Sequence, residues 1–254
     1  MHHIIIIFIC IFIVLALQKQ QEQYNESFEN QKEIYSYVIN LDRNTERYDK
    51  FTNICNQHMP STRVERFSAV DGNKMTYEEL QQIVSEKVLD DIKAIDTTGK
   101  RVDDSQLTRG MIGCYMSHLN LYQKALAEHQ DIILVFEDDA SFQIDLIKLI
   151  NDLNEFPADW DILLLGTIRI FDTNPYLNSW NRVYKFWGTQ GYIINKNGMT
   201  KMLNQSVPIS QQIDHNMGYF SQQGLLNVYA YKDNVITQNS RYSDVQMVVD
   251  KSRA

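Results

Sequence analysis

Short apolar runs rich in β-branched and aromatic residues alternate along the chain with longer stretches in which apolar residues recur every three or four positions. The short runs predict strands at residues 34–40, 64–70, 132–136, 161–165, 184–187, 192–194 and 227–231. The longer stretches predict helices after residue 44, from residue 76, over residues 108–128, near 196–203 and over 211–222. This alternation indicates an α/β domain with a mostly parallel central sheet flanked by helices, in which ligands bind beyond the carboxyl ends of the strands.

Local signals add detail to this pattern. Thr76 and Glu79 have the spacing of a capping box, and Asp71-Gly72 is a strong turn pair after the second strand. Residues 90–106 are polar and contain Thr98-Gly99, so we predict a mobile loop there.

The N-terminus carries an unbroken apolar run over residues 4–17. A helix that crosses a bilayer needs roughly 20 such residues, so the run suits a signal peptide, with Val14-Leu15-Ala16 as a cleavage site. An uncleaved signal anchor and a buried core segment are the alternatives. We therefore predict a signal peptide or signal anchor over residues 1–17, a polar spacer over 18–33 and one domain over 34–254.

Composition narrows the function classes. The 254 residues include 44% hydrophobic and 22% charged residues, which is ordinary for a globular protein. The net charge of −8 argues against nucleic-acid binding, which needs a basic face. An anionic ligand must then be held by local cations, helix N-termini or a bound metal. Cys55 and Cys114 are either buried thiols or a disulfide, since Cys10 lies in the leader.

The acidic triplet Glu137, Asp138 and Asp139 directly follows a buried strand. Three adjacent carboxylates repel one another, and a divalent cation such as Mn²⁺ or Mg²⁺ would relieve this repulsion. If the strand continues, Glu137 and Asp139 share one face and Asp138 points to the other. An acidic helix N-terminus is the alternative.

Cationic and imidazole side chains offer further candidates. Arg43 and Arg47 lie one helical turn apart and can bind a phosphate, or else pair with nearby carboxylates on a solvated face. His118 lies within the long helix, with no second His at metal-ligand spacing, so a core or boundary role is the simpler interpretation. The sequence has no P-loop, dinucleotide fingerprint or nucleophile elbow.

Six segments over roughly residues 35–245 carry a more specific pattern. They are YVINLDR (37–43) with Arg47, RFSAVDG (66–72), LTRGMIGC (107–114) with Ser117 and His118, VFEDDA (135–140), WDILLLG (160–166) and GTQGYII (188–194). In this order they resemble glycosyltransferase family 25, which includes lipooligosaccharide and collagen hydroxylysine galactosyltransferases. The collagen enzymes have two such domains, whereas one is expected here, so the resemblance does not assign collagen as the acceptor.

The resemblance implies a GT-A fold and an inverting, Mn²⁺-dependent (or Mg²⁺-dependent) transfer of galactose, or next glucose, from a UDP-sugar to a glycan, glycolipid or protein hydroxyl. Glu137, Asp138 and Asp139 would be the metal-binding motif, with Asp139 and Asp214 as catalytic residues. Asp214 would be the base that takes the acceptor proton. Donor contacts are implied for Asn40, Leu41, Arg43, Arg47, Asp71, Ser117, His118, Asp138, Gly188, Thr189 and Gly191.

Two other function classes compete with this interpretation. A catalytically inactive family member could bind carbohydrate or act as a scaffold, and a glycoside hydrolase could use paired carboxylates. The leader implies an endoplasmic reticulum or Golgi lumen, secretion, or a type II signal-anchored protein. Membrane contact is expected only through an uncleaved leader, and Asn25 and Asn204 are glycosylation sequons that matter in such a compartment.

Overall fold

The computed structural model describes residues 34–152 and 156–238. They belong to a compact unit that begins at Ile34. The predicted leader and spacer lie outside the described residues, as do Asn25 and residues 239–254. The division of the chain at residues 17 and 33 therefore stays a prediction.

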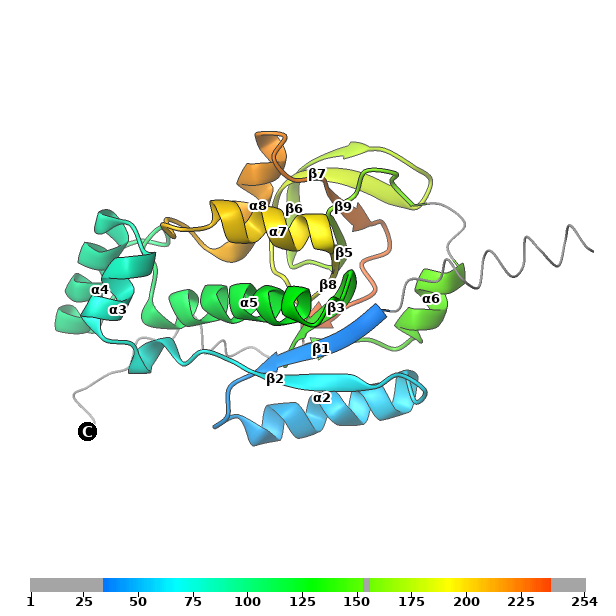
Figure 1. Cartoon of the computed structure of the whole chain (residues 1–254), viewed down its shortest axis with the longest axis horizontal. Helices are drawn as coiled ribbons and strands as arrows, with labels where there is room; N and C mark the ends of the chain where they lie inside the picture. The colour runs from blue at the N-terminus through cyan, green and yellow to red at the C-terminus, as the bar shows by residue number, and fades with distance from the viewer. Residues whose placement is uncertain (1–33, 153–155, 239–254) are drawn as a thin grey trace, which may run out of the picture. The chain divides into compact units, whose positions relative to one another are not determined.

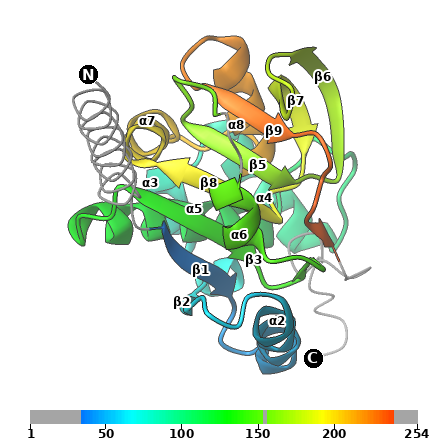
Figure 2. The ribbon, with the colours of Figure 1, turned by 90° about the vertical axis from the view of Figure 1, so that its right-hand side faces the viewer.

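An eight-stranded mixed sheet forms the centre of the domain (Figures 1 and 2). Its strands are β1 (Ile34–Asn40), β2 (Val64–Ser68), β3 (Ile132–Glu137), β5 (Ile162–Gly166), β6 (Arg169–Pro175), β7 (Trp180–Trp187), β8 (Gly191–Asn195) and β9 (Val228–Tyr231). Their order is β2-β1-β3-β8-β5-β9-β7-β6. Only β7 and β8 run against the common direction of the other six, and the short strands β4 (Ala140–Ser141) and β10 (Thr237–Gln238) pair separately. This confirms the predicted α/β class with a mostly parallel sheet.

Both faces of this sheet are covered by helices, because its central strands are apolar on both sides. Alternate side chains of β3 separate into the two hydrophobic clusters, with Ile133 and Val135 in one and Leu134 and Phe136 in the other. The first cluster includes residues of α3 (Tyr77–Ile83), α4 (Glu86–Thr98), α5 (Arg109–Ala127), α7 (Lys196–Gln205) and α8 (Ile213–Gln222). The second includes residues of α2 (Thr45–His58) and α6 (Leu146–Asp152). The sheet is therefore the middle layer of three.

The long helix α5, seen in Figure 1, packs against the sheet through the first cluster and supplies residues that line the site described below. Its predicted apolar stripe is buried, since Ile112, Tyr115 and Tyr122 have no exposed surface. Thr108 caps the helix by accepting a hydrogen bond from the Met111 N–H at 3.1 Å.

Several local predictions are confirmed and one is wrong. The capping box of Thr76 and Glu79 opens α3 as expected. The loop predicted over residues 90–106 is instead helical up to Thr98, because Ser85 caps α4 and four of its apolar residues are buried. Gly99 ends that helix with a φ of +69°, a conformation that glycine adopts without strain. The exposed strand β6 and the short helix α6 were not predicted.

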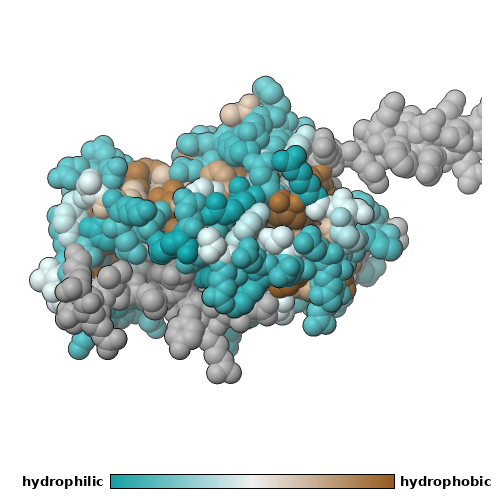
Figure 3. Space-filling model, turned by 90° about the horizontal axis from the view of Figure 1, so that it is seen from below, coloured by the Kyte–Doolittle hydropathy of each residue, from teal (hydrophilic) through white to brown (hydrophobic). Residues whose placement is uncertain are grey.

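The surface of the domain offers little continuous apolar area in the view of Figure 3, where hydrophobic residues form small, separate areas among polar ones. Cys55 and Cys114 are both free thiols, so the disulfide left open by the sequence does not form. Among the described helices, none combines the length and apolar character that crossing a membrane requires.

Candidate active site

The candidate site lies at the edge of the sheet where the parallel strands β1, β2 and β3 end. Asn40, the last residue of β1, is in register with Ser68, and Ile39 is in register with Glu137. The antiparallel strand β8 begins at this edge, so the preceding residues also arrive here, and the Glu137 N–H donates to the Gln190 carbonyl at 3.1 Å. Four predicted segments therefore meet at one place, at the sheet edge where ligands of α/β domains bind.

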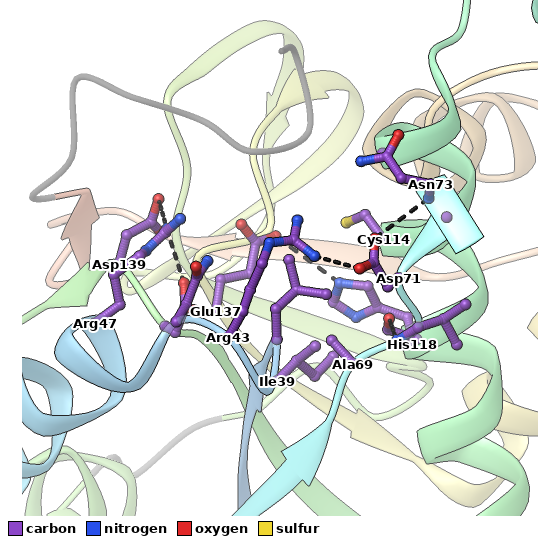
Figure 4. Close-up of a pocket in the computed structure, with 17 residues that line it drawn as sticks. Ile39, Arg43, Arg47, Ala69, Asp71, Asn73, Cys114, His118, Glu137 and Asp139 are labelled. Carbon is purple, nitrogen blue, oxygen red and sulfur yellow. Dashed lines mark hydrogen bonds and ion pairs between the residues drawn. The ribbon is translucent and has the colours of Figure 1, made fainter. Parts of the chain in front are cut away.

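A pocket opens at this edge, and its lining comes from the ends of β1 and β3, the turn after β2 and the helix α5. Figure 4 shows Arg47 and Asp139 at one side, Cys114 and His118 at the other, and Glu137 between them. The predicted site residues that line it are Leu41, Arg43, Arg47, Asp71, Ser117, His118, Glu137, Asp138 and Asp139. A second hollow continues from Arg43 and Asp71 toward Lys74 and Glu79.

Two glycines bring the turn after β2 against α5. A Cβ atom on Gly113 would lie 2.6 Å from the Gly72 nitrogen, and one on Gly72 would lie 1.8 Å from the Arg109 carbonyl oxygen. Only glycine permits such a close backbone contact. Ser117 strengthens it, because its hydroxyl accepts from the Val70 N–H at 2.8 Å and donates to the Gly113 carbonyl at 2.6 Å. Ser117 is predicted to contact the donor, but its hydroxyl already forms two hydrogen bonds that fix the turn after β2 against α5.

The acidic triplet divides into two parts. Arg47 lies 2.7 Å from Asp138 and 2.9 Å from Asp139, so one guanidinium bridges both aspartates. Glu137 instead accepts a hydrogen bond from the Thr189 hydroxyl at 2.5 Å. Glu137 and Asp139 were expected to share a face only if the strand continued, and it does not, because β3 ends at Glu137 and the two aspartates lie in a turn.

Asp138 and Asp139 are also held by amide side chains. Asn40 donates to Asp138 at 2.7 Å, while its own side-chain oxygen accepts from Arg66 at 2.8 Å. The arginine thereby orients the amide with its NH₂ group toward the carboxylate. Gln238 donates to Asp139 Oδ2 at 2.7 Å, whereas Asp139 Oδ1 is buried and has no hydrogen-bond partner among the described residues. Asn40 therefore positions a carboxylate from behind the pocket.

The acidity of the Glu137 carboxyl is strongly altered by its surroundings. Burial, and then the negative charges of Asp139 and Asp214, raise the pKa of Glu137 to about 8, although the Thr189 hydrogen bond opposes them. Its Oε1 atom lies 3.8 Å from His118 Nε2, too far for a hydrogen bond. Burial lowers the pKa of His118 to about 3, so its imidazole is neutral. The Cys114 Sγ, His118 and Glu137 ligand atoms all lie within 4.8 Å of one another.

The second predicted phosphate ligand, Arg43, forms an ion pair with Asp71. The Arg43 side chain is 45% exposed, so it can change partners without being desolvated further. Asp71 also accepts a hydrogen bond from the Asn73 N–H and begins the short 3-10 helix η1 (Gly72–Lys74). Both arginines predicted to bind phosphate thus border the pocket and are engaged by carboxylates.

Asp214, the predicted base, lies in the first turn of α8 beside the pocket. One carboxylate oxygen accepts from the Gly188 N–H at 2.8 Å, and the other from the His215 N–H at 2.8 Å. Gly188 has a φ of +91°, which is why this position needs glycine. The next residue, Thr189, binds Glu137, so a short chain of contacts joins Asp214 to the acidic triplet. Gly191 follows in β8 and packs against Ile236.

Cys114 is one of the pocket residues that the sequence did not assign to the site. The sequence predicts a buried or disulfide-forming thiol at Cys114 and offers no second His at metal-ligand spacing from His118. Cys114 lies four residues before His118 on α5, however, and this spacing places both side chains on one helix face. The four-residue spacing could therefore have indicated that Cys114 and His118 lie side by side. It could not indicate that Glu137, at the end of β3, lies next to them.

Comparison with known proteins identifies the family. Residues 33–183, more than half of the chain, match the family model described as Glycosyltransferase family 25 (LPS biosynthesis protein). The chain belongs to glycosyltransferase family 25. A family member from Aedes aegypti is 29% identical over 191 residues, covering 70% of this chain and 30% of the relative. Procollagen galactosyltransferase 2 of Homo sapiens is 25% identical over 177 residues, covering 66% of this chain and 27% of the relative.

This family 25 chain therefore aligns with less than a third of the length of these curated relatives. Among solved structures, the galactosyltransferase LgtC in complex with donor and acceptor sugar analogs aligns with a TM-score of 0.39 and 12% identity, covering 77% of this chain and 73% of that one. Mouse xyloside xylosyltransferase 1 aligns with a TM-score of 0.35 and 10% identity, covering 75% and 74%. Because both TM-scores are below 0.5, the family assignment rests on the sequence match.

Proposed function

We propose that this family 25 chain is an inverting, metal-dependent glycosyltransferase that moves galactose, or next glucose, from a UDP-sugar to a hydroxyl of a glycan, glycolipid or hydroxylysine-type protein acceptor. The observation that carries the proposal is the pairing of Asp138 and Asp139 with Arg47 in a pocket at the carboxyl ends of β1, β2 and β3. Neighbouring carboxylates can bind a metal ion, and the guanidinium beside them can bind the diphosphate that the metal ion also contacts.

Donor binding is assigned to the rim of this pocket. Arg43 and Arg47 would bind the diphosphate, since a guanidinium can donate two parallel hydrogen bonds to phosphate oxygens. Both arginines hold carboxylates in the free protein, so donor binding would exchange these partners for phosphate. Asp71 would contact the nucleoside, and the backbone at Asn40 and Leu41 would contact the base. Gly188, Thr189 and Gly191 would border the sugar.

The acidic triplet fits a divalent cation that prefers oxygen ligands. The buried Asp139 Oδ1 atom, without a hydrogen-bond partner among the described residues, is a vacant ligand oxygen beside Asp138. Asp138 and Asp139 would hold Mn²⁺ or Mg²⁺, with Glu137 turned toward Thr189 and His118. When bound, the cation would offset the negative charge that develops on the departing diphosphate.

Asp214 is proposed as the base that accepts the proton of the acceptor hydroxyl. Inversion requires a single displacement, so the base must lie on the side of the sugar opposite the leaving group. The two N–H groups that bind the Asp214 carboxylate fix its orientation. We propose a location in the secretory pathway on the basis of the apolar leader.

A panel of nucleotide sugars tests the class, the donor and the cation together. UDP-galactose or UDP-glucose should raise the melting temperature only with Mn²⁺ or Mg²⁺ present, because donor and metal are co-ligands. Asp139→Asn should lower transfer or donor hydrolysis at least ~100-fold, the scale of losing one transition-state stabiliser. Asp172→Asn on the exposed strand β6 is the matched control.

Three other results would contradict the proposal. Stabilisation by a UDP-sugar that is equal in excess chelator would exclude the metal assignment. Donor binding without turnover under any condition would favour the inactive, carbohydrate-binding alternative. Cleavage of a glycoside without a nucleotide would favour the hydrolase alternative.

A further inference from the structure

Three potential metal ligands from two elements converge at one side of the pocket. Cys114 and His118 lie one turn apart on α5, and Glu137 reaches them from the end of β3. Their ligand atoms all lie within 4.8 Å of one another. All three residues line the same pocket, and Figure 4 shows the Glu137, His118 and Cys114 side chains neighbouring one another there.

An unpartnered imidazole nitrogen points independently to a ligand. His118 has no exposed surface, and its Nε2 atom has no hydrogen-bond partner among the described residues. A buried polar atom without a partner is costly, so such atoms are rare unless something else occupies them. Nε2 faces Glu137 Oε1 at 3.8 Å, which leaves room for an ion between the two atoms.

The other ring nitrogen of His118 is held as metal-bound histidines require. Nδ1 lies 2.7 Å from the Tyr192 hydroxyl, which in turn contacts the Tyr122 hydroxyl. When Nδ1 carries the proton and donates it to Tyr192, the lone pair of Nε2 is directed at the cluster. Such outer hydrogen bonds fix the tautomer and orientation of metal-binding histidines.

The charges around the cluster also favour a cation. Asp138, Asp139 and Asp214 all act electrostatically on Cys114 and Glu137, and the cluster itself contains no positive charge. Both arginines that line the pocket are engaged by carboxylates, since Arg47 bridges Asp138 and Asp139 and Arg43 pairs with Asp71. A dication would compensate this negative charge and would supply the missing partner of His118.

From these observations we infer that Cys114, His118 and Glu137 form a Zn²⁺ site in the wall of the pocket. Thiolate, imidazole and carboxylate are the three ligand types that zinc binds in proteins, whereas Mn²⁺ and Mg²⁺ avoid thiolate. Three protein ligands leave one tetrahedral position for water or a ligand oxygen, as in catalytic zinc sites. This position would face the pocket, because all three ligands line it.

The fit requires only a small contraction. With Zn–S about 2.3 Å and Zn–N about 2.0 Å, ligand atoms around zinc lie roughly 3.3–3.8 Å apart. The His118 Nε2 to Glu137 Oε1 distance of 3.8 Å is already in this range, so only the distances to the Cys114 Sγ atom need to shorten. The inference goes beyond the proposed function, because it needs neither a sugar donor nor a cation at Asp138 and Asp139.

Cobalt(II) titration of the untagged full chain tests the site without an activity assay. In reducing, chelator-free buffer, we expect one equivalent of Co²⁺ to give a thiolate charge-transfer band and intense tetrahedral visible bands, both removed by one equivalent of Zn²⁺. The charge-transfer band should disappear in Cys114→Ser and the tetrahedral spectrum in His118→Asn. The double variant Cys10→Ser/Cys55→Ser leaves Cys114 as the chain's single cysteine and should retain both signals.

Further variants separate this site from the proposed active site. Tyr192→Phe should weaken Zn²⁺ binding about 10- to 100-fold, the usual effect of losing an outer hydrogen bond. Asp139→Asn should keep the thiolate band even if it abolishes transfer. A weak octahedral spectrum without a thiolate band, or a band that survives Cys114→Ser, would overturn the inference. If Cys114→Ser does not fold by circular dichroism, the Cys10→Ser/Cys55→Ser spectrum decides the question, since absence of the band there also overturns it.

Discussion

Gly113 on α5 meets Gly72 backbone to backbone, so closely that a Cβ atom on Gly113 would lie 2.6 Å from the Gly72 nitrogen. The contact fixes the turn that carries Asp71 against the helix that carries Cys114 and His118. It therefore determines the width of the pocket between these two elements.

Gly113→Ala should destabilise the domain and disturb the pocket. The added methyl group would meet backbone atoms of Val70 and Gly72, which cannot rotate away, and overpacking of this kind costs about 1–3 kcal/mol. Chemical denaturation should show this loss, while Gln123→Ala on the exposed face of the same helix should be nearly neutral. An unchanged midpoint for Gly113→Ala would show that the contact is looser than described.

Arg47→Gln should make stability depend on a divalent cation. The substitution leaves Asp138 and Asp139 beside each other without their bridging charge, which should lower the melting temperature in chelator. Mn²⁺ should restore more stability to this variant than it adds to the wild type, because the cation replaces the guanidinium. The exposed Arg63→Gln is the control. Equal responses to Mn²⁺ in all three proteins would argue against a metal at these aspartates.

Glu137 should make the metal-free domain less stable as pH rises from 6.5 to 8. Its carboxyl holds a proton up to about pH 8 when folded but ionises near 4.5 when unfolded, so the folded state binds more protons in between. Protonation of His118 does not change the free energy of unfolding in this pH window. Its pKa is about 3 in the folded protein and 6.5 when unfolded, so the two states differ in bound protons only below about pH 6.5. The free energy of unfolding, measured in chelator, should fall by up to about 1.4 kcal/mol per pH unit relative to Glu137→Gln. If the free energy of unfolding changes with pH in the same way in the wild type and in Glu137→Gln, the raised pKa of Glu137 is contradicted.

Asp214→Asn should lower turnover and leave donor binding unchanged. The amide oxygen can still accept one of the two N–H hydrogen bonds, but it cannot accept the acceptor proton. Loss of a general base typically lowers kcat about 10²- to 10⁴-fold. Titration calorimetry with the UDP-sugar should give an unaltered affinity. A fall in affinity with normal kcat would instead assign Asp214 to donor binding.

Asn204 should carry a glycan if the leader directs the chain to the secretory pathway. It is exposed in the last turn of α7, where the sequence placed the end of a helix. Expression in a eukaryotic secretory host, endoglycosidase treatment and N-terminal sequencing test the location and the leader together. Glycan with a start at residue 17 would indicate a cleaved signal peptide, and glycan with Met1 retained would indicate an anchor. Unglycosylated full-length protein in the cytosol would exclude the secretory location.

Local sequence determined most elements of the fold. The apolar run at Ile132–Phe136, the stripe of α5 and the capping box at Thr76 each depend on residues a few positions apart, so their physical causes are visible in the chain itself. The loop predicted over residues 90–106 is wrong up to Thr98, because the polar composition there hides a helical spacing of apolar residues. Val88, Ile92 and Ile95 recur every three or four positions in α4 and are buried there. This packing stabilises the helix although the segment as a whole is polar.

The tertiary structure alone decided how the site residues are paired. The sequence marked Glu137, Asp138 and Asp139 as one acidic unit, but Asn40 lies 98 residues from Asp138 and Gln238 lies 99 residues from Asp139. No local pattern predicts that Arg47 bridges the two aspartates while Glu137 turns to Thr189 and His118. Partners so far apart in the chain are chosen by strand register and by helix packing against the sheet, because side chains can bind only what the assembled backbone brings within their reach.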